Sequence, residues 1–171
     1  MKKIWFIRHG QSESNAGGVT TDPSSTTLTE TGRQQAERTA QTFTEAPELI
    51  ITSPYIRTQQ TAAPLRQRFP NTPHEEWQVH ELGYIAPEKY DGTTGRERIQ
   101  WIKDFVLNPD PDHKDGDEAE SFRDMLGRVE LMRQKLIDSP AQSIAVFTHG
   151  AYLRVVWYQF LLGTGRAADL G

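Results

Sequence analysis

The chain of 171 residues contains no cysteine. Disulfide bonds, thiolate nucleophiles and zinc sites with cysteine ligands are therefore excluded. Long hydrophobic runs are also missing: the most apolar stretch, residues 151–162, is interrupted by Arg154 and Gln159. A membrane-spanning helix needs roughly 20 apolar residues, so we expect no membrane segment. The apolar run at the N-terminus ends at Ile7, which is too short for a signal-peptide core, and we expect a cytoplasmic protein.

Basic residues are slightly fewer than acidic residues. Nineteen Lys and Arg face 23 Asp and Glu, for a net charge of −4. Nucleic-acid-binding domains are usually basic, so we do not expect a nucleic-acid partner. Apolar residues make up 36% of the chain and charged residues 25%, a balance typical of a globular protein. The length suits one compact unit, and we predict a single domain over residues 1–171.

Four short apolar runs predict buried strands. They are residues 4–7, 49–52, 77–79 and 143–147. These runs are continuous rather than alternating and are rich in β-branched and aromatic residues, which is typical of parallel strands covered on both faces. Helical patterns lie between them. Strands that alternate with helices predict an α/β sandwich with a mainly parallel sheet.

Five segments show apolar residues at helical spacing. They lie around residues 36–43, 62–69, 99–106, 122–136 and 151–162. A capping signal at Thr29 or Thr31 precedes the first, and Ser121 is the expected N-cap of the fourth. Pro64 should kink or break the second helix, because proline has no N–H to donate.

Two polar stretches, residues 17–25 and 108–117, are expected to be surface loops. The second is acidic and is broken by prolines. The region 82–117 looks like an insertion between core elements, and we predict that it forms a lid.

Chemically active side chains follow each predicted strand near its end. In chain order they are Arg8, His9, Arg57, Glu81 and His149. Because the carboxyl ends of parallel strands meet at one edge of a sheet, we expect these side chains in one crevice. The other histidines, at positions 74, 80 and 113, are expected at the surface.

Such a cluster suits a phosphate group. Two guanidinium groups match phosphate oxygens, and helix starts near Arg57 and Gly150 favour an anion. Arg8 and Arg57 should lower the pKa of His9 by repelling the imidazolium. A neutral imidazole can accept a phosphoryl group and split one hard step into two, and Glu81 can protonate the leaving group. The arginines repel a cation, so we predict no metal and no cofactor.

Six motifs, taken together, support a site that binds phosphate and uses a histidine. They are RHGQSESN (8–15), LTETG (28–32), SPYIRTQQT (53–61), HELG (80–83), ESF with Arg128 (120–128) and THG (148–150). In order and spacing the set resembles the histidine phosphatase superfamily, in its phosphoglycerate mutase-like branch. Many members have Gly-Glu-Ser where this chain has Ala119-Glu120-Ser121.

The resemblance implies a three-layer α/β/α sandwich and a metal-independent histidine acid-type phosphatase acting on phosphomonoesters. It implies that His9 is the phosphorylated nucleophile and that Glu81 is the proton donor. Arg8, Arg57 and His149 would form the phosphate pocket. Further phosphate contacts would come from Ser12, Asn15 and the Gly150 backbone.

Other activities remain open at this point. A phosphoglycerate-type mutase would share the site, and so would a protein phosphohistidine phosphatase or a catalytically silent phospholigand-binding domain. The glycolytic mutases look considerably longer, which favours a phosphatase. The expected partner is a small phosphorylated substrate or inorganic phosphate. The sequence leaves the oligomeric state open.

Overall fold

A computed structural model describes residues 2–107 and 110–162. Its central sheet has four strands in the order β1-β6-β3-β4, and every neighbouring pair is parallel. The strands are β1 (Lys3–Arg8), β3 (Leu49–Thr52), β4 (His74–Glu76) and β6 (Ser143–Thr148). The mainly parallel sheet predicted from the sequence is confirmed.

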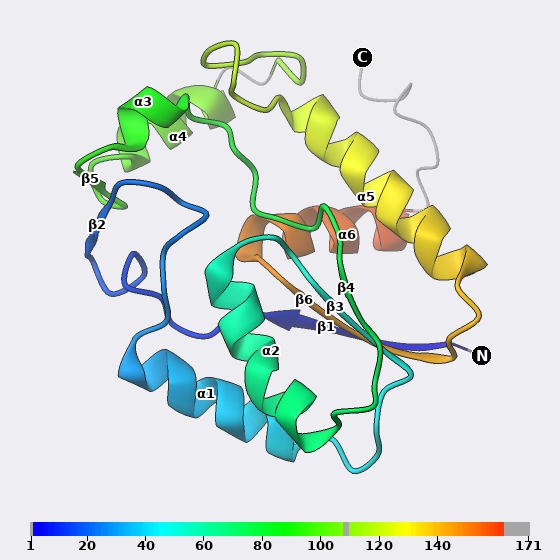
Figure 1. Ribbon diagram of the computed structural model, residues 1–171. Helices are drawn as coiled ribbons and strands as arrows, with labels where there is room; N and C mark the ends of the chain where they lie inside the picture. The colour runs from blue at the N-terminus through cyan, green and yellow to red at the C-terminus, as the bar shows by residue number, and fades with distance from the viewer. Residues whose placement is uncertain (1, 108–109, 163–171) are drawn as a thin grey trace.

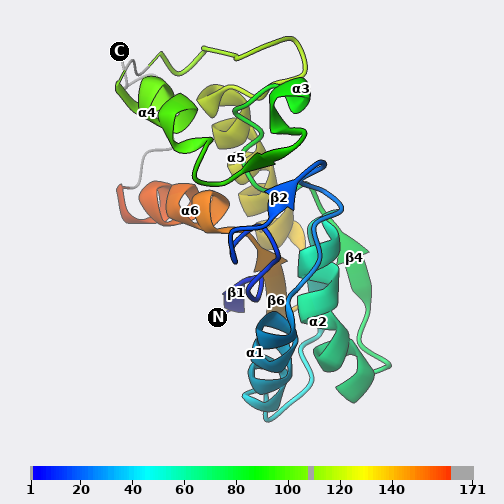
Figure 2. The ribbon, with the colours of Figure 1, turned by 90° about the vertical axis from the view of Figure 1, so that its left-hand side faces the viewer.

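Helices cover both faces of this sheet. On one face lie α1 (Glu30–Gln41) and α2 (Ile56–Arg68), and on the other lie α5 (Phe122–Asp138) and α6 (Gly150–Leu162) (Figures 1 and 2). The three-layer α/β/α sandwich is therefore confirmed. The side chain of Thr29 accepts a hydrogen bond at the start of α1, and Ser121 completes a capping box at the start of α5.

The two central strands divide their side chains between two cores. Ile51 and Val146 pack among residues of α5 and α6, whereas Ile50 and Phe147 pack among residues of α1 and α2. All four side chains are fully buried. Burial of one such side chain stabilises a fold by about 1.5–3 kcal/mol. Side chains on alternating sides of covered strands explain why both runs are continuously apolar.

The strand predicted at 77–79 is wrong, because the fourth strand is β4, at His74–Glu76. Trp77 and Val79 are buried, which produced the apolar signal. The Trp77 N–H still bonds to the Thr52 carbonyl at 2.9 Å, but the Val79 N–H bonds back to the Trp77 carbonyl at 2.7 Å. That short-range bond turns the chain away from the sheet. The true strand is polar because it lies at the sheet edge.

The predicted helices are all present, and Pro64 does not break α2. Ala62 and Leu65 on the same helix are fully buried. Their packing against the sheet keeps the helix continuous, although Pro64 has no N–H to donate. The predicted helix around 99–106 is α4 (Ile99–Leu107).

Short elements fill the segments that we expected to be loops and a lid. Between Leu82 and Asp117 lie α3 (Pro87–Tyr90), β5 (Thr93–Thr94) and α4. Strand β5 pairs antiparallel with β2 (Val19–Thr20), so the two distant segments lie side by side (Figure 1). A lid function for 82–117 stays a prediction, and residues 108–109 of the predicted acidic loop lie outside the described residues.

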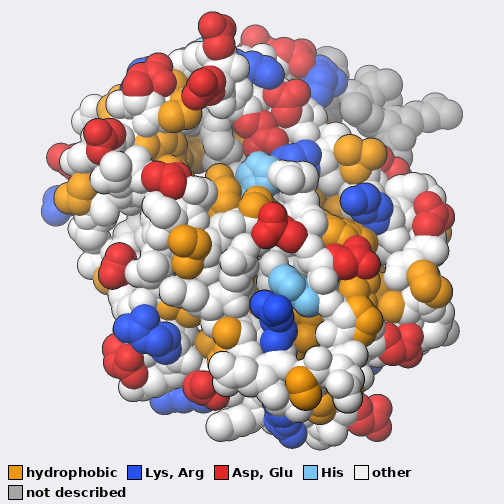
Figure 3. All heavy atoms as spheres, in the orientation of Figure 1, with side chains coloured by type: hydrophobic (Ala, Val, Ile, Leu, Met, Phe, Trp, Pro, Cys, Tyr) orange, Lys and Arg blue, Asp and Glu red, His pale blue; other side chains and the backbone are white. Residues whose placement is uncertain are grey.

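The face of the molecule above the sheet edge carries mixed charge. Acidic and basic side chains are intermingled on the face that Figure 3 shows. Among residues 2–107 and 110–162, no helix combines the length and the apolar character that a membrane span requires.

Two glycines allow the loop after β1 to rest on the first turn of α1. A Cβ on Gly10 would lie 2.5 Å from the Gly32 carbonyl oxygen, and a Cβ on Gly32 would lie 2.1 Å from the Gln11 carbonyl oxygen. Both distances are far below van der Waals contact. This close contact between the two backbone segments holds in place the loop that follows His9.

We predict that Gly32→Ala destabilises the protein by at least about 1–3 kcal/mol, the usual cost of overpacking. Gly127 provides the matched control, because it lies inside α5 and an added Cβ would meet no atom within 4 Å. Gly127→Ala should stabilise the protein by about 0.5–1 kcal/mol, through the higher helix propensity of alanine. Urea unfolding of both variants measures the difference. Equal free energies of unfolding would disprove the tight contact.

Candidate functional site

A cavity of about 1070 Å³ opens at the carboxyl edge of the sheet. Seven of the eight predicted site residues line it: Arg8, His9, Ser12, Asn15, Arg57, Glu81 and Gly150. The eighth, His149, is fully buried and is hydrogen-bonded to Arg57. The structure therefore brings all the predicted residues together.

His9 follows directly after β1 and is only 7% exposed. Its Nδ1 lies 2.7 Å from the Gly10 carbonyl oxygen. A carbonyl can only accept, so Nδ1 bears the proton. On the other side of the ring, Arg57 donates from Nε to Nε2 at 3.2 Å. The ring is therefore neutral, and Nε2 is the nitrogen that keeps an unprotonated lone pair.

Arg57 is the second residue of α2 and joins the two histidines. Its NH2 donates to Nδ1 of His149 at 3.0 Å, which leaves the proton of His149 on Nε2, 2.7 Å from the Ser53 hydroxyl. Its NH1 donates to the Pro23 carbonyl. Across residues 2–107 and 110–162, no ion pair includes Arg57. Its positive charge thus stays available to an anion in the cavity.

Burial sets the charge state of both histidines. Burial lowers the pKa of His9 to about 4, and repulsion from Arg57 adds to the effect. Burial also lowers the pKa of His149, again with Arg57 as the next cause. At neutral pH both imidazoles are uncharged, while the guanidinium keeps its charge.

Glu81 is anchored at the start of α6. Its Oε1 accepts hydrogen bonds from the N–H groups of Ala151 and Tyr152 at 2.9 and 3.1 Å. The first N–H groups of a helix have no partner within it, so the carboxylate also caps α6. Oε2 receives no hydrogen bond from the part of the chain that the structure describes. One oxygen of Glu81 therefore fixes the side chain, which lines the cavity.

A half-buried ion pair fixes the backbone beside Glu81. Arg128 of α5 donates to both carboxylate oxygens of Glu120, at 2.5 and 2.8 Å. Its remaining nitrogen donates to the carbonyls of Gln78 and His80 at 2.8 and 3.1 Å. Such a bidentate pair has strict geometry. Through this ion pair, Arg128 and Glu120 of the ESF motif position the backbone beside Glu81. The sequence did not reveal this role.

Ser12 and Asn15 hold each other within the loop after His9. Each backbone N–H lies 3.3 Å from the side-chain oxygen of the other residue. Ser12 is buried and Asn15 is exposed, and both line the cavity. Gly150, the first residue of α6, lies beside Arg8, since an added Cβ would come within 3.4 Å of the Arg8 Nε.

A model of one protein family, the histidine phosphatase superfamily (branch 1), matches residues 4–169. The chain belongs to this superfamily. A Hydrogenobacter thermophilus protein with the provisional name phosphoserine phosphatase 2 is 24% identical over 159 residues. The alignment covers 91% of this chain and 77% of that protein.

Solved structures of two phosphatases share the fold. The alpha-ribazole phosphatase of Shigella flexneri has a TM-score of 0.74 at 23% identity, over 94% of this chain and 79% of its own. A phosphoserine phosphatase of Entamoeba histolytica, solved in complex with 3-phosphoglyceric acid, has a TM-score of 0.72 at 23% identity. That match covers 95% of this chain and 81% of the other.

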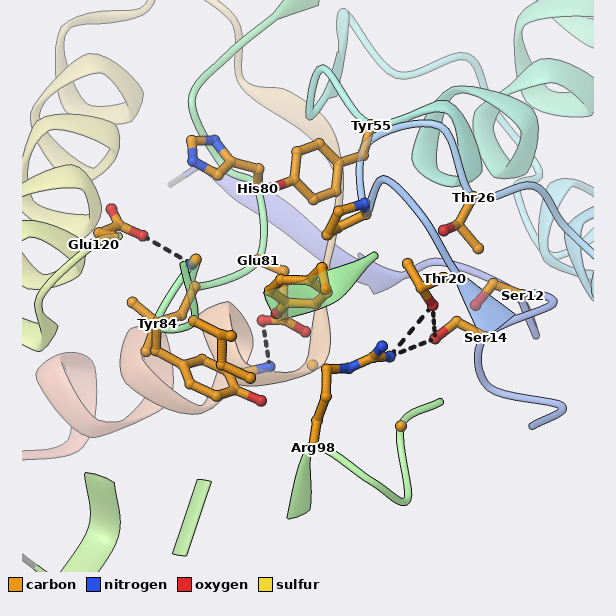
Figure 4. A pocket seen from close by; sticks show the side chains of 18 of the residues that line it. Ser12, Ser14, Thr20, Thr26, Tyr55, His80, Glu81, Tyr84, Arg98 and Glu120 are labelled. Carbon is orange, nitrogen blue, oxygen red and sulfur yellow. Dashed lines mark hydrogen bonds between the residues drawn. The ribbon is translucent and has the colours of Figure 1, made fainter. Parts of the chain in front are cut away.

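Two side chains of the histidine phosphatase cavity were missed by the sequence reasoning. Tyr55 and His80 both line the cavity, and their rings stack with centroids 5.5 Å apart (Figure 4). Burial, followed by the charge of Arg128, lowers the pKa of His80 to about 4. His80 was expected at the surface, and the structure places it half-buried in the wall of the cavity. Its place directly before Glu81 was the one signal in the sequence that pointed to the site.

Proposed function

We propose that this histidine phosphatase hydrolyses phosphomonoesters through a phosphohistidine on Nε2 of His9. The proposal depends chiefly on one observation: the neutral His9 lies beside the unneutralised charge of Arg57 in the cavity. The pair offers a lone pair to the phosphorus atom and a positive charge to its oxygens. The phosphatase names of the relatives support the same reaction class.

In the first step, Nε2 of His9 attacks phosphorus, and an N–P bond forms as the P–O ester bond breaks. The leaving oxygen takes a proton from Oε2 of Glu81. The ring then bears a positive charge, which the Gly10 carbonyl stabilises through Nδ1–H. Arg57 and Arg8 offset the negative charge of the phosphoryl oxygens.

In the second step, water attacks phosphorus and gives a proton to Oε2 of Glu81. The N–P bond breaks, its electron pair returns to Nε2 of His9, and inorganic phosphate leaves. His149 keeps Arg57 oriented through its hydrogen bond. Ser12, Asn15 and the Gly150 backbone are proposed as further phosphate contacts. The substrate is a small phosphorylated molecule, and the proposed class is a metal-independent histidine acid-type phosphatase.

The direct test is phosphate release from p-nitrophenyl phosphate in excess EDTA. We expect release by the native protein and a fall of at least about 1000-fold for His9→Ala, because the nucleophile is lost. His113→Ala is the control, since His113 is exposed and lies outside the cavity. Equal release by the native protein and His9→Ala would overturn the proposal, and dependence on a metal would contradict its metal-free form.

A second prediction concerns Glu81. Glu81→Gln should lower kcat/KM for an alkyl ester such as glycerol 3-phosphate by about 100- to 10,000-fold, because an alkoxide needs a proton to leave. The loss should be much smaller for p-nitrophenyl phosphate, whose leaving group departs as a stable anion. Glu88→Gln, at an exposed position outside the cavity, is the control. Equal losses with both esters would show that Glu81 is not the proton donor.

A further inference from the structure

Two hydroxyl groups, those of Ser53 and Thr58, lie behind His149 and outside the lining of the cavity. Ser53 follows directly after β3, and Thr58 belongs to the first turn of α2. All three side chains are fully buried. Buried polar groups are costly unless they are hydrogen-bonded, so each of these atoms needs a partner within the protein.

The direction of the hydrogen bonds around His149 is set by Arg57. A guanidinium can only donate, so Nδ1 of His149, 3.0 Å from the Arg57 NH2, must accept. The neutral ring then has its proton on Nε2, and the Ser53 hydroxyl oxygen, 2.7 Å away, accepts it. The same oxygen accepts the Tyr55 N–H at 3.2 Å. Both acceptor positions of the Ser53 hydroxyl are therefore occupied.

The proton of the Ser53 hydroxyl is left to the Thr58 hydroxyl. In the part of the chain that the structure describes, the Thr58 oxygen, at 2.9 Å, is the remaining partner of the Ser53 hydroxyl. Thr58 accepts there, because its own proton points to the carbonyls of Tyr55 and Ser53 at 2.8 and 3.1 Å. The chain of bonds that starts at the guanidinium and ends at these backbone carbonyls thus has one consistent direction.

The Thr58 hydroxyl is the acceptor that maintains this direction. Without it, the Ser53 proton has Nε2 of His149 as its nearest acceptor, and that bond requires the other tautomer, with the ring proton on Nδ1. An Nδ1–H would face the NH2 of Arg57, donor against donor, and Arg57 would lose one of its hydrogen bonds. The His149 tautomer and the orientation of Arg57 are therefore coupled.

We propose that Thr58 is a positioning residue that holds His149 in the Nε2–H tautomer through Ser53. The tautomer in turn holds Arg57 in place beside His9. The effect on turnover rests on the proposed function, in which Arg57 stabilises the charge of the phosphoryl group. Thr58 itself does not line the cavity. A Thr58 that only packed in the first turn of α2 would not change the proton position of His149.

The tautomer is measured by long-range proton–nitrogen NMR of protein with isotope-labelled histidine, which distinguishes protonated from unprotonated ring nitrogens. The native protein and Thr58→Ser, which keeps the hydroxyl, should show the Nε2–H form of His149. Thr58→Val, which has nearly the same shape and no hydroxyl, should populate the Nδ1–H form. Thr58→Ala removes the same hydroxyl and replaces Thr58→Val where the latter does not fold. An Nδ1–H form in the native protein would overturn the inference, and so would the native tautomer in the variants without the hydroxyl.

Turnover provides the second readout. Thr58→Val should lower kcat/KM for p-nitrophenyl phosphate by at least about tenfold, the lower end of the loss that follows removal of the partner of a metal-bound histidine. Thr58→Ser should remain within about threefold of the native value, because it keeps the hydrogen bond. A shifted tautomer with undiminished turnover would show that Thr58 has no positioning role.

Thr52→Val is the matched control. Thr52 is also fully buried, and its hydroxyl lies 2.9 Å from Nε2 of His74, outside the cavity. This variant should leave both the His149 tautomer and turnover unchanged, and a loss as large as that of Thr58→Val would show a general effect of removing a buried hydroxyl. The NMR readout needs no substrate: a native protein that hydrolyses no ester would contradict the proposed function, while the tautomers would still decide whether Thr58 sets the His149 proton.

Discussion

The Arg57 guanidinium donates to His9 and His149 at once, and the chemistry of the site depends on this one arrangement. Burial keeps both imidazoles neutral, and the nearby positive charge of Arg57 adds to the effect. The hydrogen bonds from Arg57 fix the proton positions of the two rings. In the proposed reaction, the same charge attracts the phosphoryl group that the neutral His9 attacks. The surrounding structure keeps this arrangement in place: the Gly10–Gly32 contact sets the position of His9, and α2 supplies Arg57 at its start.

Most of the architecture could be predicted because a buried strand or helix shows a pattern of apolar residues in its own sequence. The strands at 4–7, 49–52 and 143–147 consist of apolar residues that a covered parallel sheet requires. The position of several site residues could be predicted for a related reason: parallel strands end at one edge, so Arg8, His9 and His149, at the ends of β1 and β6, had to converge. The order of the motifs along the chain then separated the proposed site residues from solvated residues of the same type.

The remaining features depend on contacts that no local pattern encodes. Strand β4 is polar because it lies at the sheet edge, so the apolar signal of Trp77 and Val79 misplaced it by three residues. Strands β2 and β5 have two residues each and exist through their pairing with one another across the chain. The half-buried His80 stacks against the ring of Tyr55. In each case the determining partner is distant in sequence.

The most direct test of the central claim is to trap the phosphorylated enzyme. The native protein is mixed rapidly with a phosphomonoester, quenched in alkali, in which phosphohistidine survives, digested and analysed by mass spectrometry. The account predicts one acid-labile phosphoryl group on the peptide that contains His9. An enzyme that releases phosphate without this modification, or with the phosphoryl group on another residue, would contradict nucleophilic catalysis by His9.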